Sequence, residues 1–307
     1  MSRRLAVAGA QAGRLRGVLG AIVACLVAGL AQPVAAQQTM DVPYVQTPDN
    51  VVQAMLEMAA VNADDYLIDL GSGDGRIPIE AARRLGTRGM GIELDGGLVN
   101  MARAAAKRLN VSDKVTFTEA NIFVADFSQS TVLTMYLLPQ INMQMRPRLF
   151  NELRPGTRIV SHDFDMGNWK PDVRREVAVP NKSYGPPVSQ VYLWHVPAQL
   201  AGTWRWELKI DGKPRIYEAK VAQTFQELDL NVLIDGSSVS AQTAQLRGFM
   251  VTFSIEREIG GRKVSHVLRG RVDGDTIDGA ARIAGADDGV QDWKARRIAR
   301  GTVRTDL

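Results

Sequence analysis

The chain has 307 residues, of which 45% are hydrophobic and 23% charged, a composition typical of folded globular proteins and not of collagens, disordered tails or polytopic membrane proteins. This length allows two domains, each with its own core. The formal net charge of +4 comes from four arginines before residue 37, a segment without acids. The rest of the chain is therefore neutral, and nothing in its charge predicts binding to nucleic acid.

The first 36 residues predict a cleavable export signal. The arginines precede an apolar run that ends at Ala31, and Val34 and Ala36 are the small residues that signal peptidase requires before a cut. Because the run is shorter than the ~18 residues of a spanning helix, we predict a signal peptide over 1–36 and export to the periplasm or cell envelope. The alternative is an uncleaved anchor, which would be the only route to membrane association. The single cysteine, Cys25, also lies here, so the mature chain would have no cysteine-ligated metal.

Short apolar runs alternate with helical stretches as far as residue 197. The expected helices cover 51–61, 77–85 and 98–109. The expected strands cover 65–70, 89–93, 115–117, 131–136 and 158–161, with 189–196 as a final strand inserted antiparallel at the edge. This alternation predicts a doubly wound, mostly parallel α/β sheet with a Rossmann-like arrangement over 37–197. We expect this part to fold alone.

A different rhythm follows over 198–307, where short alternating runs are separated by pairs of turn residues. These pairs are Asp211-Gly212, Asp235-Gly236, Gly260-Gly261, Asp273-Gly274 and Asp278-Gly279. They predict roughly eight strands in a small antiparallel β-barrel or sandwich. The stretch Gly202-Thr-Trp204 resembles the opening of lipocalin-like barrels, and we expect Trp204 to plug a barrel filled by side chains.

The residues with the clearest chemistry follow the first strand. The stretch Asp69-Leu-Gly71-Ser-Gly73-Asp-Gly75-Arg76 opens a helix, which is the context of a nucleotide-binding turn. Arg76 stands where a dinucleotide-binding turn needs its third glycine, and the Lys-Ser/Thr pair of a P-loop is missing. The spacing resembles instead the acidic Gly-x-Gly-x-Gly turn of class I S-adenosylmethionine (SAM) methyltransferases. Glu93, at the end of the second strand, can accept both ribose hydroxyls. We therefore predict SAM as co-substrate, held by Asp69, Gly71, Ser72, Gly73, Asp74, Gly75 and Glu93.

Further matches over 42–196 resemble a narrower family. Val42-Pro-Tyr-Val-Gln-Thr-Pro48 with the helix after it, Gly91-Ile-Glu-Leu-Asp95 and Leu98-Val99 resemble the ATP synthase c-subunit lysine methyltransferases. The non-SET histone lysine methyltransferases are similar more distantly. This resemblance implies that Tyr44 and Thr47 belong to a loop that closes over the methionine end of SAM. The alternative for Thr47 is simpler, because it could cap a helix that begins with Pro48.

The remaining candidates lie after the third, fourth and fifth strands. Related enzymes often carry an acid after the third strand that bonds adenine, and we expect the amide of Asn121 to take that role. Ligands of open α/β sheets bind beyond the carboxyl ends of the strands, so Tyr136 is expected to line the acceptor channel, the alternative being an aromatic side chain that covers the sheet edge. Asp163 is a candidate to pair with an incoming ammonium, the alternative being an ordinary loop carboxylate. His162, Asp163 and Asp165 lack a further histidine or cysteine nearby in sequence, and we predict no metal site.

Together these features predict an enzyme that transfers a methyl group from SAM, with a protein lysine as the favoured acceptor. Burial lowers the pKa of an amine, so the absence of an evident strong base is no objection. A small-molecule methyltransferase is one alternative. The other is an exported module that binds a SAM-like ligand without turnover, which the export signal suggests because SAM is made in the cytosol.

Overall fold

A computed structural model describes residues 44–182, 185–286 and 289–305. The predicted signal peptide over 1–36 lies outside the described residues. Among the helices described, none is long and apolar enough to cross a membrane.

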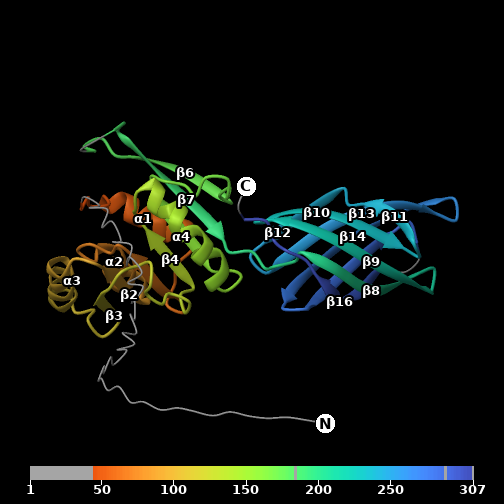
Figure 1. The fold of residues 1–307 in the computed structure, drawn as a ribbon, viewed down its shortest axis with the longest axis horizontal. Helices are drawn as coiled ribbons and strands as arrows, with labels where there is room; N and C mark the ends of the chain where they lie inside the picture. Colours follow the sequence, from red (N-terminus) through yellow and green to blue (C-terminus); the bar gives the residue numbers. More distant parts are fainter. Residues whose placement is uncertain (1–43, 183–184, 287–288, 306–307) are drawn as a thin grey trace, which may run out of the picture. The chain divides into compact units, whose positions relative to one another are not determined.

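The first part of the described chain forms a seven-stranded sheet in the order β3-β2-β1-β4-β5-β7-β6 (Figure 1). Its strands are β1 (Tyr66–Leu70), β2 (Arg88–Glu93), β3 (Val115–Glu119), β4 (Val132–Met135), β5 (Arg158–His162), β6 (Val173–Ala178) and β7 (Val188–His195). Its helices are α1 (Asp49–Met58), α2 (Arg76–Leu85), α3 (Gly96–Arg108) and α4 (Pro139–Glu152). Strands β1 to β5 pair in parallel, and β7 runs antiparallel to β5. The predicted Rossmann-like sheet is confirmed.

Both faces of this sheet are covered by helices. Successive side chains of a strand point to opposite faces, so neighbouring residues of β1 reach different helices. Leu67 of β1 shares a buried cluster with residues of α1 and α2. Its neighbours Ile68 and Leu70 lie in the cluster that contains Ile141 and Met145 of α4. The near-continuous apolar runs of the central strands follow from this double coverage.

Strand β6 was not predicted. Its sequence Val-Arg-Arg-Glu-Val-Ala lies at the edge of the sheet with mostly exposed side chains, so it lacks the alternating apolar pattern of a half-buried strand. It forms a hairpin with β7. The sequence predicts β7 as the edge strand, but β6 occupies the edge and β7 is the second strand from it. The connection between these two strands carries Lys182.

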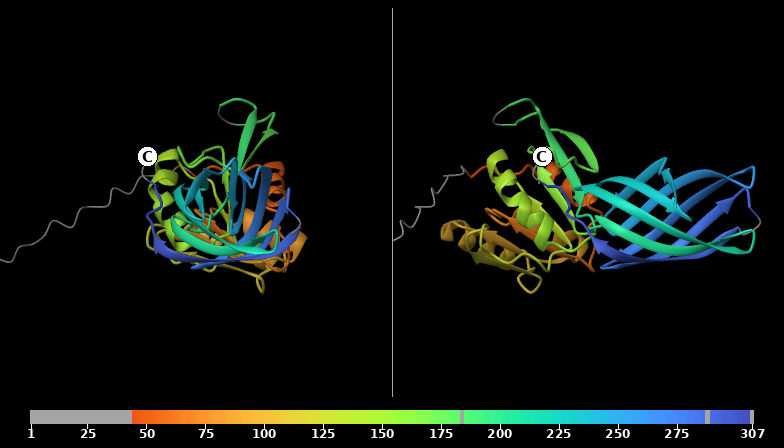
Figure 2. Two further views of the ribbon diagram at one scale, coloured as in Figure 1. Left: turned by 90° about the vertical axis from the view of Figure 1, so that its right-hand side faces the viewer. Right: turned by 45° about the vertical axis from the view of Figure 1, so that its right-hand side comes forward.

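The C-terminal part forms a nine-stranded antiparallel sheet in the order β11-β10-β9-β8-β16-β15-β14-β13-β12. Its strands are β8 (Gly202–Ile210), β9 (Lys213–Thr224), β10 (Glu227–Ile234), β11 (Ser237–Ser240), β12 (Thr243–Arg247), β13 (Met250–Ile259), β14 (Arg262–Asp273), β15 (Thr276–Ala284) and β16 (Val290–Arg300). The strands are strongly coiled (Figure 2). Burial alternates along most of them, as in β8 and β14, so one face forms a core and the other faces solvent.

Four of the five predicted turn pairs lie between consecutive strands of this sheet, but Asp278-Gly279 does not. Gly279 is inside β15 and pairs with Gly270 of β14. A Cβ atom at Gly279 would lie only 2.1 Å from the carbonyl oxygen of Arg269. This glycine therefore permits a close approach of two strands, which a sequence pattern cannot distinguish from a turn.

Aromatic side chains fill the core of the C-terminal sheet. Trp204 is buried as expected, its indole nitrogen donates to the carbonyl of Leu200 (2.8 Å), and the guanidinium of Arg297 lies over its ring at 4.4 Å. Trp206 and Trp293 pack edge to face with ring centres 6.0 Å apart. These contacts agree with an interior filled by side chains.

The two sheets share part of one core. Phe225, in the turn between β9 and β10, stacks on Trp169 with ring centres 5.3 Å apart and an angle of 4°. It also packs edge to face against Phe150 of α4 at 5.8 Å. Phe225 thus belongs to the same buried cluster as β1, β4 and α4. The predicted boundary at 197 separates the sheets, but the first core takes a side chain from beyond it.

Candidate active site

The turn between β1 and α2 depends on glycines. Gly71 and Gly73 have φ angles of 69° and 54°, in the left-handed region that favours glycine. A Cβ atom at Gly71 would lie 2.7 Å from a methyl carbon of Leu137, and one at Gly73 would lie 2.5 Å from the ring of Tyr44. Both the backbone conformation and the neighbours therefore require glycine, and the main chain of the turn is open to a close approach by a ligand.

Glu93 holds this turn against the end of β2. One carboxylate oxygen accepts the Gly73 N–H at 2.8 Å, and the other accepts the N–H groups of Leu94 (2.7 Å) and Asp95 (3.0 Å). The predicted second-strand acid is thus beside the glycine turn, as expected. Its position is set by three backbone donors before any ligand binds.

Asp69 lies inside the sheet under the turn. Its carboxylate accepts a hydrogen bond of 2.7 Å from the hydroxyl of Thr134 on β4, and only 3% of the residue is exposed. Burial raises the pKa of Asp69 to about 7, although the Thr134 hydrogen bond opposes the shift. The negative charges of Glu93 and Asp74 raise it further.

Two more predicted residues are Ser72, which lies in the glycine turn, and Asn121, which follows β3. The hydroxyl oxygen of Ser72 is buried and has no hydrogen-bond partner among the described residues, which is unusual for a buried polar atom. Asn121 follows β3, and its side-chain oxygen accepts the N–H of Phe123 at 2.9 Å. The amide nitrogen of Asn121 is then the donor available to a ligand.

The segment before α1 lies over the glycine turn. Asp74 pairs with Arg76 at 2.7 Å and accepts a bond of 3.2 Å from Gln46. Gln46 also donates to the hydroxyl of Tyr44, and Arg76 donates to the carbonyl of Thr47 at 2.9 Å. These contacts place Tyr44 and Thr47 together beside the turn.

The predicted alternative for Thr47, a helix cap, is wrong. Helix α1 begins at Asp49 with Pro48 at its N-cap, and no side chain caps it. The Thr47 hydroxyl instead lies 3.2 Å from Nδ1 of His162. Because Pro48 occupies the cap itself, Thr47 lies before the helix and turns toward β5.

His162 joins several parts of the acceptor side. Its Nε2 lies 2.9 Å from the hydroxyl of Ser189 on β7, and its ring centre is 3.9 Å from that of Tyr136. Only 1% of the residue is exposed, and burial lowers its pKa to about 4 despite the nearby Asp163. The ring is therefore neutral at pH 7. From the sequence His162 was considered only as a metal ligand, because its partners come from segments far apart along the chain.

Asp163 already has a cationic partner within the chain. Its carboxylate lies 2.6 Å from the ammonium of Lys182 and accepts the N–H of Gln190 at 3.0 Å. Lys182 also donates to the carbonyl of Val188 at 2.8 Å. The predicted pairing of Asp163 with an incoming ammonium would therefore compete with Lys182.

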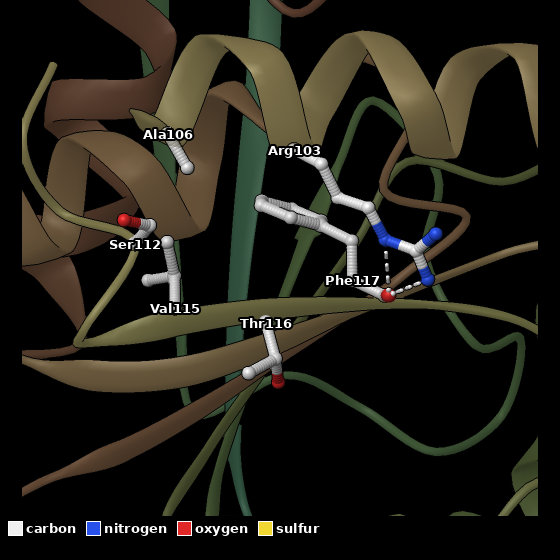
Figure 3. A pocket seen from close by; sticks show the side chains of 6 residues that line it. All are labelled: Arg103, Ala106, Ser112, Val115, Thr116 and Phe117. Carbon is white, nitrogen blue, oxygen red and sulfur yellow. Dashed lines mark hydrogen bonds between the residues drawn. The ribbon is translucent and has the colours of Figure 1, made fainter. Parts of the chain in front are cut away.

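A pocket of about 740 Å³ lies on the acceptor side, and of the predicted site residues Tyr44 and Tyr136 line it, whereas Glu93 and the glycines of the turn do not. Its lining comes from the segment before α1, the start of α2, the ends of β4 and β5, and the β6–β7 connection, and includes Tyr44, Arg76, Tyr136, His162 and Lys182. A hollow of about 300 Å³ lies elsewhere, between α3 and β3, where Arg103 donates to the carbonyl of Phe117 (Figure 3). None of the predicted site residues lines that hollow. In the described part of the chain, no three His, Cys, Asp or Glu residues are grouped as a metal site would require.

The chain resembles known methyltransferases. The model of the ANTKMT methyltransferase domain matches residues 69–173. A protein-lysine N-methyltransferase of Saccharolobus islandicus is 43% identical over 42% of this chain and 81% of that protein. The ATP synthase c-subunit lysine N-methyltransferase of Xenopus laevis is 32% identical over 51% of this chain and 69% of its own length. The chain belongs to this family of class I, SAM-dependent lysine methyltransferases.

The solved structures include an RNA methyltransferase from Salinibacter ruber in complex with S-adenosyl-L-homocysteine. It is 51% identical, covers 51% of this chain and 96% of its own, and has a TM-score of 0.46. The lysine methyltransferase family assignment agrees with the resemblance found in the sequence. The glycine turn, Glu93 and the start of the acceptor side all lie within the part that the family model matches.

Proposed function

We propose that this methyltransferase transfers a methyl group from SAM to the side-chain amine of a protein lysine. The observation that carries the proposal is the pocket, which extends from Tyr44 and Arg76 beside the glycine turn to Tyr136 and His162 at the ends of β4 and β5. A co-substrate on the turn and an amine beside Tyr136 would share one space. The names of the related enzymes support lysine as the acceptor.

The residues around the turn fit SAM. The fixed carboxylate of Glu93 would accept the ribose hydroxyls, and the amide nitrogen of Asn121 would donate to the adenine. The glycine backbone from Gly71 to Gly75 and the unpartnered hydroxyl of Ser72 belong to this same turn. Asp74, and Asp69 in its ionised form, would supply negative charge for the cationic methionine end, which Tyr44 and Thr47 would cover.

The reaction requires alignment more than acid–base groups. SAM supplies a methyl group on a sulfonium, so the leaving group departs as a neutral sulfide. The lysine nitrogen forms its bond to the methyl carbon as the carbon–sulfur bond breaks, after the ammonium has lost a proton to solvent. Tyr136, held against His162, would orient the amine, and desolvation of the bound amine would lower its pKa.

Two features outside this site complete the proposal. We infer that the chain is exported through its N-terminal 36 residues, which the start of the mature protein, measured by intact mass, would test. We also infer that the C-terminal sheet closes into a barrel. Residues of β10 contact residues of β12, and Leu246 of β12 shares a core with Val232 of β10, which supports closure near the two sheet edges.

A labelling experiment tests the proposed function. The full chain is incubated with methyl-labelled SAM and a cell-envelope extract, and the label is followed through protease, nuclease and small-molecule fractions. We expect methylated lysine by mass spectrometry, and no transfer by a Glu93→Ala variant. Label in RNA or in a small molecule would contradict lysine as acceptor. Binding of SAM without any transfer would indicate a ligand-binding module instead.

A further inference from the structure

The acceptor side contains an ion pair that the reaction as described does not use. The Lys182 ammonium and the Asp163 carboxylate are 2.6 Å apart, and their side chains are only 9% and 10% exposed. Backbone groups of β7 fix both partners. The Asp163 carboxylate accepts the Gln190 N–H, and Lys182 donates to the carbonyl of Val188. Asp163 has a φ angle of 61°, uncommon for a residue other than glycine, so the backbone is held in a costly conformation to present this side chain.

One member of this pair, Lys182, borders the pocket that would receive the acceptor. Lys182 lines the pocket together with Tyr136 and His162, and Nε2 of His162 lies 3.5 Å from the Asp163 carboxylate. Because His162 is neutral at pH 7, it does not compensate the charge of Asp163. Lys182 is the cation in contact with that carboxylate.

The other titratable groups around the pair are mostly compensated. Arg76 is paired with Asp74, and Arg174 and Glu176 on β6 both bond the side chain of Gln190. Asp165 follows on the same loop and accepts the N–H of Gly167 at 3.0 Å. Among the described residues, the phenols that border the region belong to Tyr44, Tyr136 and Tyr192.

A bare carboxylate at this place would oppose the reaction. An opposite charge within about 4–6 Å raises the pKa of an amine by roughly 1–3 units, and an ammonium has no lone pair with which to attack the methyl group. We propose that Lys182 is a positioning residue whose ammonium neutralises Asp163, so that the pocket receives the acceptor lysine as a neutral amine. This inference rests on the proposed function and assigns Asp163 a role opposite to direct capture of the substrate ammonium.

The pH dependence of kcat tests the inference, because kcat reports ionisations of the bound complex. The acceptor is the purified protein identified by the labelling experiment, at saturating concentration and with saturating SAM. In Lys182→Met, the rising limb of kcat should move to higher pH by about one unit or more. The turnover at pH 7 then falls about tenfold or more and recovers in alkaline buffer. Lys182→Arg keeps the positive charge and should leave the limb in place.

The double variant Asp163→Asn/Lys182→Met separates charge from structure. It removes both charges, so its limb should return toward that of the wild type even though the ion pair is lost. Lys170→Met removes an exposed lysine that pairs with Glu227, and serves as the matched control without effect on the limb. SAM affinity, measured for each variant, should stay unchanged.

Two results would overturn the inference while the wild type still methylates lysine. The first is an unmoved limb in Lys182→Met. The second is a loss of turnover that is equal at all pH values and is not rescued in the double variant, which would assign Lys182 a purely structural role. Failure of the wild type to methylate any lysine would instead overturn the proposed function itself.

Discussion

The two sides of the proposed site are built in different ways. On the SAM side, the turn consists of consecutive residues from Asp69 to Arg76, and Glu93 of the adjacent strand accepts the N–H of Gly73 within it. On the acceptor side, Tyr136 and His162 meet the distant Thr47 and Ser189. A locally encoded cofactor turn can serve many acceptors, because the residues that choose the acceptor come from other segments.

The acceptor side also depends on the C-terminal sheet. Phe225 stacks on Trp169, whose carbonyl accepts the indole N–H of Trp194 on β7. Arg146 of α4 donates to the carbonyls of Met166 (3.2 Å) and Thr305 (3.1 Å). Phe225 and Thr305, both beyond residue 197, therefore support the loop after β5. The contacts of the glycine turn come from residues before 197.

The largest expected effect concerns this support. Phe225→Ala should lower the free energy of unfolding by ~3–5 kcal/mol, because it empties a buried aromatic site between Trp169 and Phe150. Denaturant unfolding measures the change, and Ile216→Ala, at an exposed position of β9, is the control. The fragment 37–197 should be destabilised relative to the full chain by a similar amount. A change below about 1 kcal/mol in Phe225→Ala would show that the two cores are independent.

A second large effect is expected on the SAM side. Gly73→Ala should weaken binding of S-adenosyl-L-homocysteine about 10- to 100-fold, since the left-handed backbone costs ~1–3 kcal/mol and the new Cβ would displace Tyr44. Calorimetry measures the affinity. Gly212 in the β8–β9 turn also has a positive φ, 70°, but has no neighbour within 4 Å of an added Cβ. Gly212→Ala should leave the affinity unchanged, and equal losses in both variants would contradict the role of the turn.

Asp69 should give the SAM side a distinctive pH dependence. Its pKa is about 7 in the folded chain, above the ordinary value of 3.8, so its contribution to stability is fully present below pH 4 and is lost as the pH rises through 7. His162 and His266, whose pKa values burial lowers to about 4, act in the opposite direction. The difference between wild type and Asp69→Asn isolates the carboxylate.

Unfolding of both proteins without SAM, measured between pH 4 and 8, tests this. The wild type should lose several kcal/mol relative to Asp69→Asn across that range, at about 1.4 kcal/mol per pKa unit. Asp113→Asn, at an exposed position, should run parallel to the wild type. Parallel curves for wild type and Asp69→Asn would mean that Asp69 titrates normally.

The smallest effect is expected at Thr47. Thr47→Val removes the contact with His162, a loss of about 1 kcal/mol, and should lower kcat about fivefold with little change in SAM affinity. Thr47→Ser keeps the hydroxyl and should retain most of the turnover. If the serine and valine variants lose the same turnover, the methyl group of Thr47 matters and the hydroxyl does not.

The same contrast explains what the sequence could predict. The parallel sheet, the glycine turn and Glu93 follow from periodicity and spacing within about 25 residues of chain. The sequence could not show that Lys182 pairs with Asp163 or that His162 contacts Ser189. These contacts depend on how β6 and β7 pair with β5, and β6 has no apolar alternation. The packing of Phe225 on α4 could not be predicted either, since nothing in the sequence around it indicates this contact. The pairing of strands far apart in the sequence brings the acceptor-side residues together, and short sequence patterns do not show it.

The measurement that tests this account most directly compares two variants on the same preparations, by calorimetry with SAM and by turnover with the labelled acceptor. Glu93→Ala leaves ribose hydroxyls without their acceptor and frees the turn, so it should lose ~1–3 kcal/mol of SAM affinity. Tyr136→Phe should keep that affinity and lower turnover alone, because we propose that its hydroxyl orients the acceptor amine. Equal losses of SAM affinity in both variants, or unchanged turnover in Tyr136→Phe, would contradict the division of the site into a SAM side and an acceptor side.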